Sequence, residues 1–365
     1  MPVKIMEKNN DKTVAIAMSG GVDSSAAAVL LLQQGFTVFG VTMLHYDSAC
    51  KKELTAVNDA AAVCKKLSID HHVVEIKQEF FTAVIDDFIT EYLAGHTPNP
   101  CVRCNPRIKW GVLLQKSLDL GADLFATGHY CRIEFDAATR RYCLRKAPTL
   151  KKDQSYALWK LRQEQLARTI FPLSHLTKPE VRTVAAQAGL AIADKGDSQE
   201  VCFIEDDDYN SYITEYLRAK NIEIIPGNIL DQQGHVIGKH RGYPFYTIGQ
   251  RKGLGIALGR PVFVTEINAE HNTIRIGDKE DLLSPGLTAS DINWVCCAEP
   301  QPGMPVTAHI RYNDPGFPAT LEKVDTHSFT IRFAEPRLSV TPGQSAVLYD
   351  GDRLLGGGII DKAIK

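Results

Sequence analysis

The sequence predicts an α/β protein in which a parallel sheet is followed by a small β-rich domain and a C-terminal β-barrel. Strand-like and helix-like segments alternate through the first half, which is typical of a parallel sheet with helices on both faces. The middle is rich in Gly and β-forming residues, and the last part carries short alternating segments between Pro-Gly pairs, as all-β barrels do. A length of 365 residues favours several domains, which we place at 1–205, 206–280 and 281–365.

Each element of the first half has its own local signal. Thr13–Met18 is a short apolar run, Ser24–Gln34 is helical up to a C-cap glycine, and Phe36–Met43 reads as a second buried strand. We expect further helices at Leu54–Leu67, Phe80–Leu93, Ile108–Leu120 and Val181–Ala188, strands at His72–Ile76 and Asp123–Thr127, and a hairpin at Arg132–Lys146. Ligands of such sheets bind beyond the carboxyl ends of the strands.

Composition excludes several classes of protein. The chain is 44% hydrophobic, so it can bury a core and is not a disordered chain. Its 41 Lys and Arg against 43 Asp and Glu argue against a surface that binds polyanions everywhere, although a local basic face is compatible with this balance. The N-terminus has no apolar run before a cleavage site, and no stretch reads as a membrane span. We therefore expect a cytoplasmic protein with no membrane partner.

A glycine-rich turn between the first strand and the first helix predicts a phosphate site. In the segment Met18–Ser25, Gly20 and Gly21 let backbone N–H groups approach an anion, and the helix N-terminus adds partial positive charge. Hydroxyls of three serines can donate to phosphate oxygens. The segment lacks the Gly-Lys-Ser/Thr of a Walker loop and the G-x-G-x-x-G pattern. The structural alternative is an ordinary turn with a serine cap.

The nine cysteines are the second signal. Their odd number and irregular spacing argue against a disulfide framework, so in a reducing compartment they are buried fillers, metal ligands or catalysts. Cys101 and Cys104 lie in a proline-rich stretch that we expect to be a loop between two helices, and Cys202 lies about a hundred residues later. A single C-x-x-C is a weak zinc signal because a closed site needs four ligands. A lone Cys202 would by default be a buried thiol.

A basic strip with aromatics runs through the middle of the chain. The segment from 239 to 265 has no Asp or Glu and interleaves aromatic residues with five basic ones, Lys239, Arg241, Arg251, Lys252 and Arg260. Such a strip can contact phosphates and stack on unpaired bases of RNA. The alternative is a solvated β-surface whose aromatics belong to the core.

An ordered set of motifs spans nearly the whole chain: SGGVDSS, GVTM, TPNPxxxCN, ATGHY, KDQSY, DSQEVCF, GYPFYTIGQRKGLGI and RY. Together they resemble the tRNA-specific 2-thiouridylase family, which installs sulfur on the wobble uridine of tRNA. The first motif resembles the ATP-pyrophosphatase loop, whose members adenylate a substrate. The resemblance implies an adenine nucleotide α-hydrolase-like N-terminal domain and a tRNA-uridine 2-sulfurtransferase activity that consumes ATP.

The resemblance also implies roles for individual residues. Cys104 corresponds to the nucleophile and Cys202 to the cysteine that carries a persulfide, the two becoming a disulfide during turnover. Asp23 would hold Mg²⁺. ATP would be bound by Ala17, Met18, Ser19, Gly20, Gly21, Val22, Asp23, Ser24, Met43 and Gly128. The tRNA would be contacted by Asn99, Pro100, Cys101, His129, Lys152, Asp153, Gln154, Arg311, Tyr312 and Gln344. A persulfide-delivering sulfur carrier or a cysteine desulfurase would be a partner.

One position departs from the family. The resemblance implies an acidic residue three positions before the nucleophile, with an acid–base role, whereas this chain has Cys101 there. Cys101, Cys104 and Cys202 could together supply three thiolates to an iron–sulfur cluster, which is the mechanistic alternative. Two further hypotheses are an ATP-dependent ligase of small molecules and an RNA-binding module that only binds ATP. Neither accounts for the paired cysteines.

Overall fold

The computed structural model describes residues 11–45, 51–194, 201–204, 208–256, 258–298 and 300–365. Its N-terminal sheet is five-stranded and parallel, with the order β3-β2-β1-β4-β7. The strands are β1 (Thr13–Ala17), β2 (Thr37–Leu44), β3 (His71–Glu75), β4 (Leu124–Ala126) and β7 (Thr169–Ile170). The predicted parallel sheet is confirmed.

Helices cover both faces of this sheet because the side chains of β1 alternate between two cores. Val14 and Ile16 pack with one set of helices, while Ala15 packs with the other. The first set is α1 (Val22–Gln33), α2 (Lys51–Leu67) and α8 (Lys178–Gln187). The second is α3 (Lys77–Phe80), η1 (Phe81–Asp86), α4 (Asp87–Leu93), α5 (Pro100–Cys104), η2 (Asn105–Leu113) and α6 (Leu114–Asp119). The remaining short helices are η3 (Leu150–Lys152), η4 (Ser155–Leu158), α7 (Gln163–Leu166), η5 (Ala191–Asp194), η6 (Tyr243–Phe245) and η7 (Glu280–Leu282).

The expectation of a loop around Cys101 and Cys104 was wrong. Both cysteines lie on helix α5, which begins eight residues before the helix start that we predicted at Ile108 and runs directly into the π-helical segment η2. Pro100 does not break this helix, because it occupies the first turn, where no N–H is needed. The Asn99 side chain caps the helix by accepting a hydrogen bond from Cys101 N at 3.1 Å. The two thiols are therefore placed by regular backbone rather than by a flexible turn.

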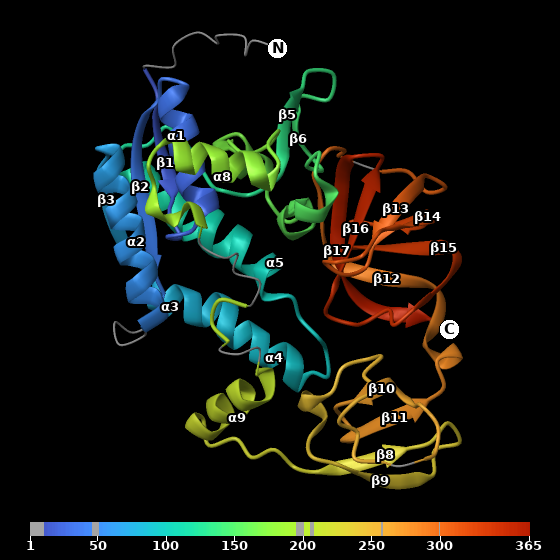
Figure 1. Ribbon diagram of the computed structural model, residues 1–365. Coiled ribbons are helices and arrows are strands. Elements are labelled where there is room, and N and C mark those ends of the chain that lie inside the picture. Colours follow the sequence, from blue (N-terminus) through green and yellow to red (C-terminus); the bar gives the residue numbers. More distant parts are fainter. Residues whose placement is uncertain (1–10, 46–50, 195–200, 205–207, 257, 299) are drawn as a thin grey trace.

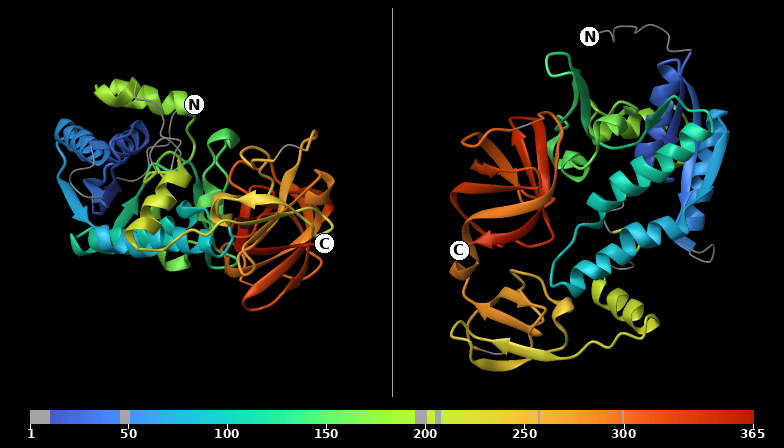
Figure 2. Two further views of the ribbon diagram at one scale, coloured as in Figure 1. Left: turned by 90° about the horizontal axis from the view of Figure 1, so that it is seen from below. Right: turned by 180° about the vertical axis from the view of Figure 1, so that it is seen from behind.

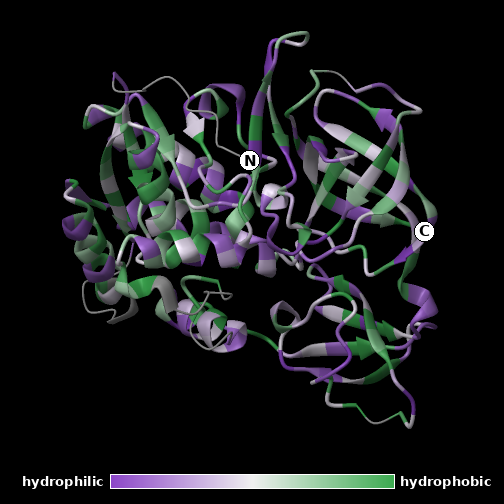
Figure 3. Ribbon diagram, turned by 45° about the horizontal axis from the view of Figure 1, so that its top comes forward, coloured by the Kyte–Doolittle hydropathy of each residue, from purple (hydrophilic) through white to green (hydrophobic). Residues whose placement is uncertain are grey.

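The C-terminal strands close into a six-stranded barrel in the order β12-β15-β14-β13-β16-β17, with β12 also paired to β17. They are β12 (Leu283–Trp294), β13 (Pro305–His309), β14 (Phe317–Val324), β15 (Ser328–Leu338), β16 (Ser345–Asp350) and β17 (Arg353–Ile364). Hydrophobic and hydrophilic residues alternate along them (Figure 3), and Leu287, Leu321 and Ile331 are fully buried inside. The predicted barrel is confirmed.

The predicted hairpin joins the first domain to the barrel. Strands β5 (Arg132–Asp136) and β6 (Arg141–Arg145) pair with each other, and Arg145 pairs with Arg353 of β17. Leu144 of the hairpin shares a core with Val347 and Tyr349 of β16. The hairpin, which leaves the N-terminal unit and reaches the barrel in Figure 1, thus couples the two parts of the chain.

The central sheet has the order β10-β11-β8-β9 and its own small core around Ile229, Val264 and Ile274. Its strands are β8 (Gly227–Leu230), β9 (Val236–His240), β10 (Phe263–Asn268) and β11 (Thr273–Gly277). The preceding helix α9 (Tyr209–Ala219) instead buries Ile213 and Leu217 in the core of the first domain. Figures 1 and 2 show the central sheet below the barrel and beside the end of α4. We retain the domain boundaries 1–205, 206–280 and 281–365 as a proposal.

Candidate active site

The glycine-rich turn after β1 is preorganised by its own serines. Ser24 Oγ accepts a hydrogen bond from Ser19 N at 3.2 Å and lies 3.3 Å from Ser19 Oγ, while Ser25 Oγ donates to Gly21 O at 2.9 Å. Gly20 has a φ of 66°, and a Cβ there would lie 2.6 Å from Ala56 O. The turn therefore requires glycine at position 20 and keeps a fixed shape at the N-terminus of α1, where backbone N–H groups are available to an anion.

The other residues assigned to ATP lie at the same edge of the sheet. Met43 is near the carboxyl end of β2, and Gly128 follows β4, the neighbour of β1 on its other side. A Cβ at Gly128 would be 2.7 Å from Ser24 N, so this residue packs directly on the first turn of α1. Because carboxyl ends of parallel strands share one edge, the topology brings these residues together at the predicted ligand edge.

Asp23 has two protein partners that the sequence did not reveal. Lys178 Nζ contacts its two carboxylate oxygens at 2.7 and 2.9 Å, and Tyr130 O–H donates to Oδ1 at 2.7 Å. Lys178 is the first residue of α8, so it arrives from a helix 155 residues further along the chain. The carboxylate is thereby held at the start of α1. The sequence offers no spacing from which this partner could have been found.

The two catalytic candidates lie close enough together for Cys104 to raise the pKa of Cys202. Cys104 is buried, and burial raises the pKa of its thiol to about 11. Cys202 retains exposed surface, yet the protein atoms around it disfavour the thiolate and raise its pKa to about 12, with Cys104 and then Cys101 adding to the effect. Both are free thiols. The structure thus brings together cysteines that lie 98 positions apart in the chain.

Lys109 is a site residue that our sequence analysis missed. It is half-buried in η2, and its positive charge lowers the pKa values of Cys104, Cys202 and His129. For the two thiols this opposes burial, which raises their pKa values by more. Its position five residues after Cys104 would put it about 140° away around an α-helix. The i→i+5 bonding of η2, visible in the bond from Leu114 N to Lys109 O, turns it toward the cysteine face. The sequence gives no sign of this placement, because it depends on the π-helical hydrogen bonding of η2.

Tyr312 of the barrel lies near Cys101. Burial raises the pKa of the Tyr312 phenol, and Cys101 and Asp153 raise it further, so both lie near Tyr312. Tyr312 also contacts the ring of Tyr156 with 6.0 Å between centroids. Arg311 acts on the pKa of the same Tyr156, whose rise is caused mainly by burial. Arg311 and Tyr312 are both exposed and able to meet a large ligand.

Other residues assigned to tRNA have internal partners. Asp153 accepts hydrogen bonds from Ala147 N at 2.8 Å and Ser155 Oγ at 2.6 Å, and burial raises its pKa. Gln154 Oε1 accepts from Tyr130 N at 2.9 Å. Gln344 Nε2 donates to Thr97 O at 2.7 Å, a contact between the barrel and the segment before α5.

His129 is neutral. Its Nδ1 lies 2.8 Å from Thr127 Oγ1 and its ring packs on Trp110, while burial lowers its pKa well below the usual value, with Lys109 adding to this. Pro100 is buried, Cys101 is exposed and Lys152 is half-buried. Residues 197–200 of the DSQEVCF motif lie outside the described residues. The assignment of tRNA contacts stays a prediction.

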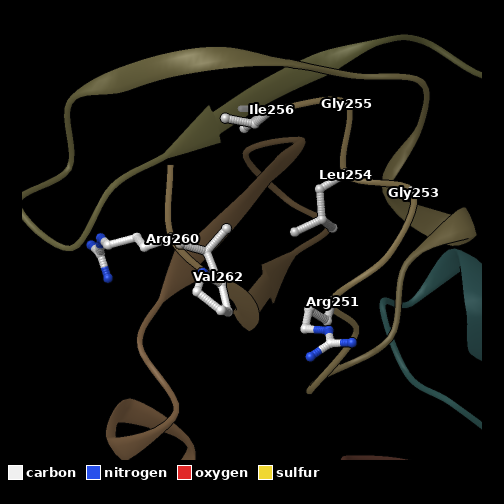
Figure 4. A pocket seen from close by; sticks show the side chains of 8 residues that line it. Arg251, Gly253, Leu254, Gly255, Ile256, Arg260 and Val262 are labelled. Atoms are coloured by element: carbon white, nitrogen blue, oxygen red, sulfur yellow. The ribbon is translucent and has the colours of Figure 1, made fainter. Parts of the chain in front are cut away.

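The basic strip borders an open hollow of about 470 Å³ in the central domain. Arg251 and Arg260 line it together with glycines 253 and 255 (Figure 4). All five basic residues of the strip are exposed. One of them, Arg260, forms an ion pair with Asp278. Among the aromatic residues of the strip, Tyr246 is buried and Tyr243 and Phe245 are half-buried. The alternative that these aromatics belong to the core of the domain therefore holds in part.

Within the described ranges, no group of three His, Cys, Asp or Glu side chains is close enough together to hold a metal ion. Among the same residues, no helix is both long and apolar enough to cross a bilayer.

The fold and site together define a protein with a parallel α/β nucleotide-binding domain, a small β-sheet domain and a C-terminal β-barrel. Family models match as a tRNA methyl transferase HUP domain at residues 12–206, a tRNA methyl transferase PRC-barrel domain at 210–278 and an aminomethyltransferase β-barrel domain at 284–360. The tRNA-specific 2-thiouridylase MnmA of Heliobacterium modesticaldum is 50% identical over 357 residues, which are 96% of this chain and 92% of that protein. The enzyme of that name from Clostridioides difficile is 46% identical over 97% of this chain and 99% of its own length. This chain belongs to the tRNA-specific 2-thiouridylase family.

Solved structures are more distant. The U34-tRNA thiolase NcsA from Methanococcus maripaludis with its 4Fe–4S cluster superposes with a TM-score of 0.36 and 20% identity over 58% of this chain and 67% of that one. A 4-thiouridine synthetase in complex with RNA and ATP gives a TM-score of 0.34 and 19% identity over 57% and 50%. These superpositions are too loose to bear on the chemistry.

Proposed function

We propose that this protein uses ATP to replace O2 of the tRNA wobble uridine with sulfur. The observation that carries the proposal is the proximity of Cys104 and Cys202, two thiols from separate parts of the chain, the first of which raises the pKa of the second. The chain is 45–50% identical to relatives that are named tRNA-specific 2-thiouridylases, and the similarity covers nearly the whole length of both.

The first step is adenylation. Uridine O2 is a poor leaving group and must be activated before sulfur can replace it. It attacks the α-phosphate of ATP, and pyrophosphate is released. The turn at 18–24 supplies backbone N–H groups and the positive end of α1 to the phosphates. Asp23 would give Mg²⁺ one carboxylate, and this ion commonly takes one or two besides phosphate and water ligands. Lys178 contacts both oxygens of that carboxylate and Tyr130 donates to one of them, so Mg²⁺ would have to share or replace these contacts.

The second step is sulfur transfer, which forms a disulfide and therefore needs one two-electron reductant per turnover. The terminal sulfur of a Cys202 persulfide attacks C2 of the uridine, and AMP leaves. The Cys104 thiolate then attacks Cys202 Sγ and breaks the S–S bond, which frees 2-thiouridine and leaves a Cys104–Cys202 disulfide that a dithiol reductant reopens. Burial keeps Cys104 protonated at neutral pH, and Lys109 is placed to favour its thiolate. The persulfide would come from a sulfur carrier or a cysteine desulfurase.

Pyrophosphate release in the presence and absence of tRNA tests the proposal, together with mass analysis of tRNA nucleosides from cells with and without the protein. We expect tRNA-dependent pyrophosphate release and a loss of 2-thiouridine from cells that lack the protein. Release driven by a small molecule without tRNA would favour the ligase hypothesis. Binding of tRNA without any pyrophosphate release would favour the RNA-binding module.

The iron–sulfur alternative has one observation in its favour, since Cys101 and Cys104 both act on Cys202. Against it, no three thiols come together as a ligand set in the described part of the chain, and we do not favour it. An anaerobic preparation with visible absorbance and stoichiometric iron would reverse this preference.

Cys101→Ser should keep appreciable single-turnover thiolation, whereas Cys104→Ser should lose it. Cys101 is exposed and places a thiol where the resemblance implies an acidic residue, so it is a different kind of acid–base group. Cys104 and Cys202 already complete the sulfur chemistry. Thiouridine formed in one turnover under a strong reductant measures both variants. Equal losses would make Cys101 a full catalytic residue and favour the iron–sulfur mechanism.

Charge reversal at Arg251 and Lys252 should weaken tRNA binding and flatten its salt dependence without changing ATP affinity. Each lost phosphate contact lowers the slope of log K against log salt by roughly 0.7–0.9. Lys116→Glu is the matched control, because Lys116 is equally exposed but lies on α6, away from the central domain. An unchanged slope in the double variant would return the strip to an ordinary solvated surface.

A further inference from the structure

Arg103 lies between the two cysteines of α5, and its side chain points away from solvent. It is only 13% exposed, and its guanidinium contacts carboxylates on two different elements. On α4, Nε is 3.3 Å from Asp87 Oδ2, and an outer nitrogen is 3.8 Å from Glu91 Oε1. On the barrel, the other outer nitrogen donates to Asp291 Oδ2 at 2.6 Å. Arg103 therefore ties the cysteine-bearing helix to a different domain.

Asp291 reaches Arg103 because β12 is irregular at this point. The register between β12 and β17 shifts between Ser290 and Asn293, and Asp291 has a φ of 51°. Bulges of this kind re-aim a side chain, and positive φ is uncommon outside glycine, although Asp and Asn tolerate it best. The barrel strand thus departs from regular pairing at the residue that contacts α5.

Charge complementarity makes this contact specific. Lys160 Nζ also donates to Asp291 Oδ2, so two cations share one carboxylate. Burial raises the pKa of Asp291, but Lys160 and Arg103 outweigh it and the net pKa is lowered. Asp87 Oδ2, by contrast, accepts no hydrogen bond among the described residues although it lies near Arg103 Nε. The hydrogen bond to Asp291 is therefore the best-formed contact of the Arg103 side chain.

The barrel also holds the segment that leads into α5. Thr97 N donates to Pro342 O at 2.9 Å, and Thr97 O accepts from Gln344 Nε2 at 2.7 Å. A Cβ at Gly343 would be 3.0 Å from Thr97 N, so the two chains pass in close contact. The helix with both cysteines is thus fastened to the barrel before its first residue and again in its middle.

We propose that Asp291 is a positioning residue for sulfur transfer: through Arg103 it holds α5 so that Cys104 can reach the sulfur on Cys202. This inference rests on the proposed function and adds a role for the barrel to it. The turn that binds ATP follows β1 and makes none of these contacts. Displacement of α5 should therefore slow the transfer of sulfur and leave adenylation intact.

Asp291→Asn tests this, since Asn keeps the shape of the side chain and tolerates positive φ. We expect single-turnover thiouridine formation to fall roughly tenfold to hundredfold, because small misplacements of reacting groups have effects of this size. Pyrophosphate release that depends on tRNA should stay within about twofold. Arg103→Gln should behave alike, and the double variant should lose little more than either single one. Glu322→Gln, which breaks the Arg332–Glu322 pair elsewhere on the barrel, is the matched control and should match wild type.

Two results would overturn the inference. One is normal thiouridine formation by Asp291→Asn. The other is an equal decrease of both steps with a lowered melting temperature, which would make the contact merely structural. If wild-type protein forms no thiouridine at all, the proposed function fails instead, so the two failures are distinguishable.

Discussion

Cys202→Ser should lower thiouridine formation by about a thousandfold or more, while tRNA-dependent pyrophosphate release stays within about twofold of wild type. A serine hydroxyl cannot carry a persulfide, and its oxygen cannot form the disulfide with Cys104. The turn that we assign to ATP follows β1 and lies far from Cys202 along the chain. Sulfur transfer and adenylation should therefore separate cleanly.

The measurement is one turnover of thiouridine formation with a persulfide-bearing donor, in parallel with pyrophosphate release. Cys297→Ser is the matched control, because Cys297 is also only partly buried but lies after β12, where its thiol donates to Leu355 O. It should behave like wild type. Thiouridine at the wild-type level from Cys202→Ser would refute the role of Cys202 as the sulfur carrier.

Gly21→Val should remove adenylation, with a decrease of pyrophosphate release of about a hundredfold or more, and should hardly change thermal stability. Gly21 has an extended backbone with φ −104°, and the nearest atom to a Cβ there would be Ser19 Oγ at 3.4 Å. The protein itself has room for a Cβ at this position. A β-branched group at the N-cap would, however, stand where phosphate must approach the N–H groups of α1.

Gly20→Val is the contrasting variant. At φ 66° and with Ala56 O only 2.6 Å from a Cβ, this substitution should lower the melting temperature as well as the activity. Calorimetry of both variants and pyrophosphate release with tRNA decide between the two effects. Gly21→Val with a normal rate of pyrophosphate release would show that the turn has another role.

The alternation of strands and helices could be predicted because hydrophobic periodicity is a local property. The strand after Asp123 and the helix after Thr177 were found within a few residues, as was the hairpin at 132–146. The expected loop around Cys101 is wrong because a proline in the first turn of a helix does not interrupt it. Pro100 instead begins a helix, and capping by Asn99 decides this locally.

The motifs could be found in the amino-acid sequence alone: a glycine turn after the first strand, cysteines at 101, 104 and 202, and their order along a chain of this family. Which residues meet depends on how the chain packs in three dimensions. Lys178 joins Asp23 from a helix 155 residues away, a π-helix turns Lys109 toward Cys104, and an irregular barrel strand aims Asp291 at Arg103. Such contacts arise from packing between distant segments, and their partners share no spacing or period in the sequence. Local propensity can place an element, but it cannot say what that element will touch.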